Sequence, residues 1–323
     1  MKISVALCTY NGESFLNEQL ESILNQTFPV TEIIVCDDGS TDNTVTILRQ
    51  FERAYSNLFK IYINTENLGV IKNFEKAILL CMGDIIFLAD QDDIWEINKV
   101  EKCLYFFGNT PEVLGVFTNA EMMEESGQPT NKTLWEVLGF DNVKKEMQLK
   151  DIFRFMLLYG NMIAGSCLSI KREAMNLIFP FKYIEDMWHD EWIAMKLGEK
   201  NKIYFLDEPL IKYRMHNNQQ TKWLWEDREE KNKKRNSFIQ KQAHLYPLDY
   251  YKHWRRRTAA VERLSANGFT IDHHLLKEIW QERKKGLLIH LKNNSWFKRK
   301  YILLKLWLKN EENLSLWDLV LTI

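Results

Sequence analysis

The chain has 323 residues, of which 46% are hydrophobic and 27% are charged, and this balance excludes a wholly disordered chain. The 43 Lys and Arg residues nearly cancel the 44 Asp and Glu residues, so no overall positive field indicates a nucleic-acid partner. The five cysteines lack C-x-x-C spacing, which argues against a zinc ribbon or a disulfide framework and favours a reducing compartment.

The N-terminal segment and the hydropathy of the chain bear on its localisation. Met1 and Lys2 run directly into a strand-like segment that is too short for the hydrophobic region of a signal peptide. The sequence contains no run of about 18 apolar residues, the minimum for a spanning helix. We therefore expect a cytoplasmic protein that is soluble or attached peripherally to a membrane.

Residues 1–120 alternate between short apolar runs and amphipathic segments of helix length. This alternation is typical of β-α-β units around a mostly parallel sheet, as in a Rossmann-like α/β fold. The strands are expected at residues 3–8, 32–36, 59–63 and 85–88, and helices at about 15–24, with Ser14 as its cap, and at 44–54. Each polar motif of this half then falls at the carboxyl end of a strand, where open α/β sheets bind ligands.

The second half of the chain divides into an irregular part, a further α/β part and a C-terminal region of different composition. Residues 120–145 are polar and contain Gly127, Pro129 and Gly139, which predicts a loop or an insertion on the acceptor side. A strand at 165–170, a helix at 190–198 and a strand at 202–206 follow. We expect a catalytic domain over 1–220, with a donor half at 1–120 and an acceptor half at 121–220, and a mainly helical region over 221–323.

The C-terminal region concentrates basic and aromatic residues. The segment from Trp296 to Lys309 mixes aromatic and aliphatic side chains with lysines, as an interfacial helix at a membrane surface does. A helix that packs on the catalytic domain with a solvated basic face explains the same pattern. Both interpretations stay open.

The strongest chemical signal is a group of three carboxylates. Asp90, Asp92 and Asp93 lie within four positions directly after an apolar strand. Like charges that close repel one another, and a divalent cation with a preference for oxygen ligands, Mg²⁺ or Mn²⁺, neutralises them. Such a cation bridges the two phosphates of a nucleotide diphosphate and stabilises it as a leaving group. The alternative is a polar turn with a carboxylate at a helix start.

Two further polar loops end the first two strands. Asp37 and Asp38 provide carboxylates that accept hydrogen bonds from a base or from ribose hydroxyls. The loop from Thr9 to Glu13 offers hydroxyl and amide groups around Gly12. Taken singly, each of these loops is equally explained as a turn between a strand and a helix.

Together and in this order, the motifs are far more specific. The segments VALCTYNG, IIVCDDGSTDNT, NLGVIKNF and FLADQDDIW resemble the donor-binding half of the family-2 glycosyltransferases, which have a GT-A-type fold. The resemblance is strong over residues 1–100 and looser to about 217, and its D-Q-D-D segment is closest to the rhamnosyltransferase-like branch.

The resemblance implies a nucleotide-sugar site and a metal site. It places Thr9, Asn11 and Glu13 in the nucleotide pocket, Asp37 at the base, Asp38 near the ribose, and Asp90, Asp92 and Asp93 in the acidic stretch. Asp90 and Asp92 form the D-x-D pair, with Asp92 nearest the Mn²⁺ or Mg²⁺ ion. A histidine in the segment YRMHN, here His216, reaches the metal in several members of the family. Imidazole suits Mn²⁺ better than Mg²⁺, so His216 favours manganese.

The resemblance also implies the catalytic base. The segment WHDEW matches the place of an acidic pair whose second residue is the base, which makes Asp190 the first choice and Glu191 the second. In an inverting displacement this carboxylate takes the proton of the attacking hydroxyl. His189 departs from the pair's usual first residue. Arg214 is expected to support the diphosphate, and the stretch from Gly165 to Cys167 to line the sugar and acceptor pocket.

The implied function is that of an inverting hexosyltransferase in polysaccharide biosynthesis for the cell envelope. Its donor is a nucleotide-diphosphate sugar, with dTDP-rhamnose ahead of a UDP-hexose, and its acceptor a cell-surface glycan or a lipid-linked oligosaccharide at the inner face of the cytoplasmic membrane. A non-catalytic nucleotide-sugar or glycan-binding module is the alternative. A nucleotidyltransferase is disfavoured because residues 9–13 contain no Lys or Arg. The donor base, the linkage, the acceptor and the oligomeric state cannot be predicted from the sequence.

Overall fold

The computed structural model describes residues 1–142, 144–148, 151–185, 187–219, 234, 240–241, 244–295, 298–299 and 301–303. The chain divides into two compact units, the first formed by Met1–Met156 with Gly160–Arg228 and the second by Leu157–Tyr159 with Glu229–Ile323. The domain boundary expected near residue 220 falls outside the described residues and stays a prediction.

The first unit is built on a single mixed sheet. Within its described residues the strand order is β3-β2-β1-β4-β8-β6-β9-β5, and β7 pairs with β6. The strands are β1 (Ile3–Thr9), β2 (Glu32–Asp37), β3 (Phe59–Ile63), β4 (Ile85–Ala89), β5 (Ile94–Trp95), β6 (Gly115–Glu124), β7 (Pro129–Thr133), β8 (Leu168–Lys171) and β9 (Ile203–Met215). The half that contains β3, β2, β1 and β4 is parallel, and β8 joins it in the antiparallel sense.

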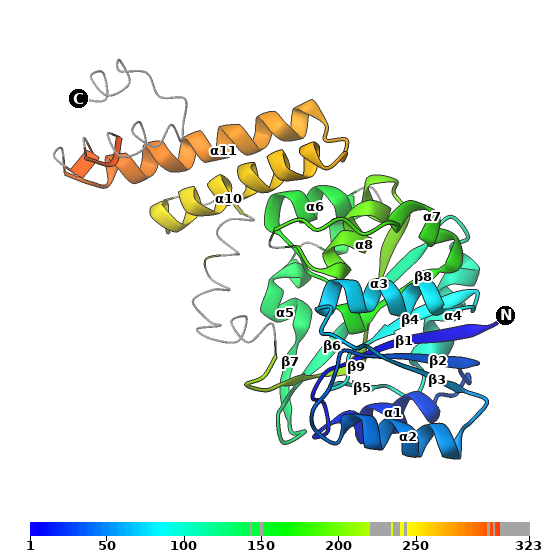
Figure 1. Ribbon diagram of the computed structural model, residues 1–323. Helices are drawn as coiled ribbons and strands as arrows, with labels where there is room; N and C mark the ends of the chain where they lie inside the picture. The colour runs from blue at the N-terminus through cyan, green and yellow to red at the C-terminus, as the bar shows by residue number, and fades with distance from the viewer. Residues whose placement is uncertain are drawn as a thin grey trace. The chain divides into compact units, whose positions relative to one another are not determined.

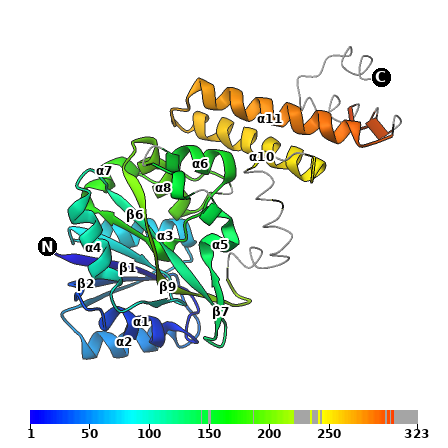
Figure 2. The ribbon, with the colours of Figure 1, turned by 180° about the vertical axis from the view of Figure 1, so that it is seen from behind.

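Helices cover both faces of this sheet. They are α1 (Leu16–Leu24), α2 (Thr44–Ala54), α3 (Val70–Leu80), α4 (Lys99–Asn109), α5 (Leu134–Leu138), α6 (Asp151–Tyr159), α7 (Met175–Ile178) and α8 (His189–Glu199). The pair α1 and α2 lies on one face, and α3 with α8 lies on the other (Figure 1, Figure 2). Every residue of β1, β2 and β4 is buried, as apolar strands covered on both faces must be. The expected α/β fold is confirmed.

The sheet's second half brings distant segments together. β6 pairs with β8 in the antiparallel sense and with β9 in the parallel sense. The short strand β5, which follows the acidic segment, pairs with β9 through Ile94–Lys212 and Trp95–Ile211. This pairing sets the residues after the acidic segment beside the end of β9, where Arg214 lies.

Three expectations from the sequence were wrong in detail. Residues 120–145 are not a loop, because β6 continues to Glu124, β7 pairs back on it, and Thr133 and Glu136 form a capping box that starts α5. Ser14 does not cap α1, whose N-cap position is Phe15 without a side-chain cap. The strand expected at 165–170 begins at Leu168, after a 3₁₀ turn over Gly165–Cys167.

The second unit contains the helices α10 (Pro247–Ala266) and α11 (His273–Lys292). Gly286 permits close packing of the two, since a Cβ on it would come within 3.0 Å of Tyr250 and Tyr251. The expected helical C-terminal region is therefore confirmed. No helix of the described residues is both long and apolar enough to cross a membrane. Most of the segment interpreted as an interfacial helix, from Trp296 onward, lies outside the described residues.

An aromatic cluster fills the region that the sequence predicts as a loop. The Trp135 side chain is fully buried. Its ring meets Phe140 and Phe205 edge to face, with centroids 5.0 and 5.7 Å apart, and Phe117 at 5.8 Å. Edge-to-face aromatic pairs in a packed interior stabilise the fold beyond their burial alone.

We predict that Trp135→Ala lowers the free energy of unfolding by about 3 to 5 kcal/mol, because it leaves a cavity among these rings. Tyr105→Ala is the matched control, since Tyr105 is 77% exposed, and we expect a change within about 0.5 kcal/mol. Urea unfolding followed by circular dichroism measures both. Equal decreases in the free energy of unfolding for the two variants would show that the aromatic cluster does not stabilise the fold.

Candidate active site

The carboxyl ends of β1 and β2 are joined by buried hydrogen bonds. The Thr9 hydroxyl donates to Asp37 Oδ2 at 2.7 Å, and the Ser40 amide and hydroxyl donate to the same carboxylate at 2.9 and 2.6 Å. Both Thr9 and Asp37 are buried. Because Asp37 holds its own turn and the neighbouring strand, the floor of the predicted nucleotide pocket is fixed before any ligand binds.

Asp38 orders the loop that leads into α3. Its Oδ1 accepts from Asn64 Nδ2 at 2.7 Å and from the Leu68 amide at 2.8 Å, and its Oδ2 accepts from the Gly69 amide at 2.9 Å. The side chain is buried. The described partners of Asp38 thus belong to this loop, and a contact with ribose stays a prediction.

The first loop is bound to the loop after β2. Asn11, at a positive φ of 49°, accepts through Oδ1 from the Thr41 amide at 2.8 Å. Glu13 accepts through Oε2 from the Asn43 amide at 2.8 Å and from its side chain at 2.7 Å. The two loops therefore form one rim at the ends of β1 and β2.

The acidic segment is clamped to the same rim. Gln91 accepts from the Tyr10 amide at 2.7 Å and donates to the Tyr10 carbonyl at 3.0 Å. Gly12 makes room for this clamp, because a Cβ there would lie 2.2 Å from Gln91 Oε1. The three motifs that the sequence places at separate strand ends are thus brought together.

The carboxylates of the acidic segment lie in very different surroundings. Burial, together with the charges of Asp92, Asp93 and Asp190, raises the pKa of Asp90 well above its ordinary value. Burial and the Asp92 charge raise the pKa of Asp93 to about 7, and its Oδ1 accepts from the Arg214 amide at 3.1 Å. The site therefore concentrates negative charge that a bound cation would relieve.

Two buried cationic side chains, Lys99 and Arg214, lie near this acidic segment. Lys99, which the sequence analysis missed, is fully buried, and its Nζ donates to the Ser166 carbonyl at 2.7 Å and lies 3.9 Å from the centre of the Trp95 ring. Burial lowers its pKa to about 8. In the sequence Lys99 is simply the first residue of an amphipathic helix, so no signal there distinguishes it.

Arg214 is the second cation, and its side-chain nitrogens have partners within the fold. Its Nε and Nη1 donate to the carbonyls of Asp92 and Glu125 at 2.9 Å, and its Nη2 pairs with Glu18. The guanidinium also lies over the Phe15 ring at 4.6 Å. These bonds position the Asp92 turn, and support of the diphosphate by Arg214 stays a prediction.

Asp92 and His216 form the part of the site that suits a metal ion. Asp92 Oδ2 and His216 Nε2 lie 2.8 Å apart. Two adjacent ligands of an octahedral ion with bonds of about 2.1 Å lie about 3 Å apart, so this pair fits one shared ion. Within the described part of the chain, no group of three or more His, Cys, Asp or Glu side chains is arranged to hold a metal.

Asp90, the predicted third ligand, has neighbours of its own. Its carboxylate accepts from the Ser166 amide, and its Oδ2 lies 3.6 Å from where a Cβ on Gly165 would be. The turn after β4 directs Asp90 and Asp92 to different neighbours, and a joint role of Asp90, Asp92 and His216 as metal ligands stays a prediction.

The predicted base lies at the start of α8. Asp190 is buried, and its burial raises the pKa to about 6. Its Oδ1 accepts from the Glu191 amide at 2.7 Å, and its Oδ2 lies 3.4 Å from Asn161 Nδ2. The segment of Asp190 lies near Asp90, because a Cβ on Gly165 would come within 2.6 Å of the preceding residue, His189, and within 3.6 Å of Asp90 Oδ2.

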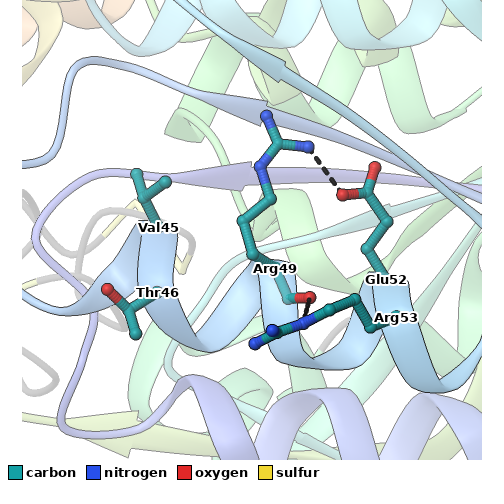
Figure 3. Close-up of a pocket in the computed structure, with 5 residues that line it drawn as sticks. All are labelled: Val45, Thr46, Arg49, Glu52 and Arg53. Atoms are coloured by element: carbon teal, nitrogen blue, oxygen red, sulfur yellow. Dashed lines mark hydrogen bonds and ion pairs between the residues drawn. The ribbon is translucent and has the colours of Figure 1, made fainter.

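A shallow hollow also occurs along α2, away from these residues. Val45, Thr46, Arg49, Glu52 and Arg53 line it (Figure 3). Arg49 pairs with Glu52 at 2.6 Å, and Arg53 Nε donates to the Arg49 carbonyl at 3.2 Å. These charges are engaged within one helix, so the strand ends remain the candidate site.

Comparisons with known proteins bear on the family and the fold. The model of the family described as Glycosyl transferase family 2 matches residues 4–177. The chain is 30% identical over 227 residues to the dTDP-rhamnosyl transferase RfbG of Shigella flexneri, a match that covers 66% of this chain and 73% of that protein. The chain spans 65% and 66% of the length of the first two curated relatives that it matches, slightly less than two thirds.

Two solved structures share the fold. One is S. aureus TarS 1-349 in complex with UDP-GlcNAc, with a TM-score of 0.55, 20% identity, and coverage of 91% of this chain and 74% of that chain. The other is the mannosyltransferase PcManGT from Pyrobaculum calidifontis in complex with GDP-Man and Mn²⁺, with a TM-score of 0.53, 14% identity, and coverage of 94% and 79%. At these identities the likeness shows a GT-A-type fold and no more.

We predict that Gly12→Ala lowers the free energy of unfolding by about 1 to 3 kcal/mol, because the new methyl group displaces Gln91 and leaves the Tyr10 backbone groups without their partners. Gly108→Ala is the matched control. Gly108 lies in α4 with no neighbour within 4 Å of an added Cβ, so this change should stabilise the chain slightly. Urea unfolding gives both values, and hydrogen exchange reports the Tyr10 amide. Unchanged exchange at Tyr10 in Gly12→Ala would refute the clamp.

Proposed function

Since the chain belongs to glycosyltransferase family 2, we propose that it transfers a sugar from a nucleotide-diphosphate donor to a glycan by a metal-assisted, inverting single displacement. The observation that carries this proposal is that the start of α8, with Asp190, and the acidic segment after β4, with Asp90, both approach Gly165. One carboxylate is then available to the acceptor hydroxyl, while the others face the donor side. A general base and a leaving-group site in one cluster are what a single displacement needs.

The donor side consists of the loops at the ends of β1, β2 and β4. We assign Thr9, Asn11, Glu13, Asp37 and Asp38 to the nucleotide pocket, either by contact or by fixing its backbone. Asp92 and His216 would hold Mn²⁺ or Mg²⁺, and an imidazole ligand favours Mn²⁺. The ion, when bound, neutralises the diphosphate as it leaves. Arg214 stabilises the Asp92 turn, because its amide donates to Asp93 Oδ1 and its Nε donates to the Asp92 carbonyl.

The acceptor side is centred on Asp190. With a pKa of about 6, the carboxylate is largely ionised at neutral pH. This pKa is also close enough to neutral pH for efficient proton transfer. Glu191, the next residue of α8, is the second candidate. Within this arrangement the acceptor hydroxyl gives its proton to Asp190 as its oxygen bonds to the anomeric carbon, and the diphosphate leaves on the opposite side.

The donor and acceptor follow from the relatives by analogy. Similarity to the rhamnosyl transferase RfbG favours dTDP-rhamnose, and the TarS complex with UDP-GlcNAc makes a UDP-hexose the rival. The similarity to the putative teichuronic acid biosynthesis glycosyltransferase TuaG of Bacillus subtilis supports a cell-envelope glycan or a lipid-linked oligosaccharide as acceptor. A peripheral site at the inner face of the cytoplasmic membrane, with contact through the C-terminal residues, suits such an acceptor.

The first prediction is that Mn²⁺ strengthens binding of dTDP or UDP at least tenfold, and that Asp92→Asn removes this gain while leaving the metal-free affinity unchanged. The substitution removes the ligand charge and keeps the shape of the side chain. Calorimetric titration with each nucleotide, with and without Mn²⁺, measures the effect. Asp84→Asn is the control, since Asp84 lies at the opposite end of β4 and bonds the Lys2 amide. If neither dTDP nor UDP bound, with or without Mn²⁺, the transferase proposal would be wrong.

The second prediction concerns pH. Because the base must be ionised, kcat/KM should fall about tenfold per pH unit below the pKa of about 6 and level off above it. Asp190→Asn should lower the rate by about 10² to 10⁴-fold and abolish this dependence. Glu191→Gln is the control and should keep the pH profile. The reverse pattern, an inactive Glu191→Gln and an active Asp190→Asn, would transfer the role to Glu191.

A further inference from the structure

The solvent side of helix α11 is basic. None of its exposed residues is acidic, and those residues are His273, His274, Lys277, Trp280, Gln281, Lys284, Lys285, Leu288 and Lys292. Lys277, Trp280, Lys284, Leu288 and Lys292 follow one another at spacings of three or four residues, so they lie along one side of the helix. We call these five side chains the α11 face.

The lysines of this face lack the acidic neighbours that usually accompany lysines on a surface helix. Side chains three or four residues apart are neighbours on a helix, and a glutamate there pairs with a lysine. Lys285 has such a partner in Glu282, at 3.5 Å. No Asp or Glu stands three or four residues from Lys277, Lys284 or Lys292 in the sequence. Their charges are therefore not compensated along the helix.

The two glutamates of α11 are instead engaged with other parts of the second unit. Glu282 accepts from the Tyr250 hydroxyl of α10 at 2.5 Å, and Glu278 pairs with Lys241 at 3.0 Å. The helix α10 lies along one side of α11 (Figure 1, Figure 2). The fold thus separates the charges of α11, with its carboxylates bound to partners and its lysines left at the surface.

The α11 face also contains two large apolar side chains. Trp280 is 39% exposed and Leu288 is 44% exposed. The guanidinium of the buried Arg283 lies 4.8 Å from the centre of the Trp280 ring and supports it from within the fold. Single apolar residues on a surface are common, but here both lie in line with the three lysines. Lysines that alternate with Trp and Leu are typical of a helix that lies in the plane of a membrane surface.

The shape and chemistry of the face suit an anionic lipid surface better than a nucleic acid. The face runs for about 22 Å, since a helix rises about 1.5 Å per residue, and a straight helix meets a flat surface along its whole length. Lipid phosphates attract the lysines, and the boundary beneath the headgroups takes up the indole ring and the leucine. A nucleic-acid backbone would match the lysines and leave Leu288 without an apolar partner.

We propose that the α11 face is a docking surface for an anionic lipid bilayer, with its lysines at the headgroup phosphates and with Trp280 and Leu288 at the apolar boundary. This inference rests on the proposed function for its purpose, because it brings the chain to the surface where a lipid-linked acceptor lies. It deepens that function by naming the partner and the residues that contact it.

The test is flotation of the full chain with lipid vesicles. The wild type should bind vesicles that contain phosphatidylglycerol and phosphatidylcholine, and raised salt should weaken this binding. It should bind vesicles of phosphatidylcholine alone at least tenfold more weakly. Each lysine near an anionic surface contributes about a factor of five to the partition coefficient. The triple variant Lys277→Gln, Lys284→Gln and Lys292→Gln should therefore bind about 100-fold more weakly.

Two further variants separate the α11 face from general electrostatics. The matched control is Lys72→Gln, Lys132→Gln and Lys200→Gln, which removes the same charge from exposed positions of the first unit and should bind as the wild type does. Trp280→Gln keeps the charge of the face and should weaken binding severalfold, because the apolar contribution is lost. Thermal unfolding of both triple variants should match the wild type, since the substituted side chains are exposed.

The outcomes distinguish the docking surface from the proposed function. Unchanged vesicle binding by the α11 triple variant, or an equal loss in the control variant, would overturn the docking surface. Equal binding of the wild type to both kinds of vesicle would overturn it as well, and so would a preference for duplex DNA over vesicles. Calorimetric titration with Mn²⁺ and UDP or dTDP tests the proposed function separately, and the α11 triple variant should keep the wild-type affinity there.

Discussion

The constraint on which the site depends is the crowding of carboxylates that are partly or fully buried. Asp90, Asp92 and Asp93 follow a fully buried strand, and Asp190 approaches from α8. Burial disfavours the charged form of Asp90, Asp93 and Asp190, and neighbouring negative charges disfavour it further at Asp90 and Asp93. The fold offsets part of this cost with Lys99 and Arg214, which touch the backbone around the carboxylates. The electrostatic cost that Lys99 and Arg214 do not offset is the reason to expect a divalent cation.

The rest of the first unit serves to hold these groups in place. Buried hydrogen bonds tie β1 to β2 through Thr9 and Asp37, and Gln91 ties the acidic segment to the loop after β1. The pairing of β5 with β9 brings His216 to Asp92 across more than a hundred residues. A rigid rim of this kind places the ligands before the donor arrives, which lowers the ordering cost of binding.

Much of the fold was predictable because it follows from local patterns. Alternating apolar runs give β3 and α2 their observed bounds, and turn residues place the polar loops at the strand ends. The region around Trp135 was mispredicted because its glycines and polar residues mask a buried aromatic cluster assembled from four segments. The burial of Lys99 and the ring stack of His189 depend on neighbours far away in the sequence, such as Ser166 and Phe74. No local pattern carries that information, and the turn that separates Asp90 from Asp92 was invisible for the same reason.

The central claim is that Asp92 and His216 hold a divalent ion that also binds the donor diphosphate. Pulsed electron paramagnetic resonance of the protein with Mn²⁺ and UDP or dTDP tests it directly. The account predicts a nitrogen coupling from the imidazole, which disappears in His216→Phe, together with phosphorus couplings from the nucleotide. A manganese signal without either coupling, at concentrations where the nucleotide is bound, would contradict the account.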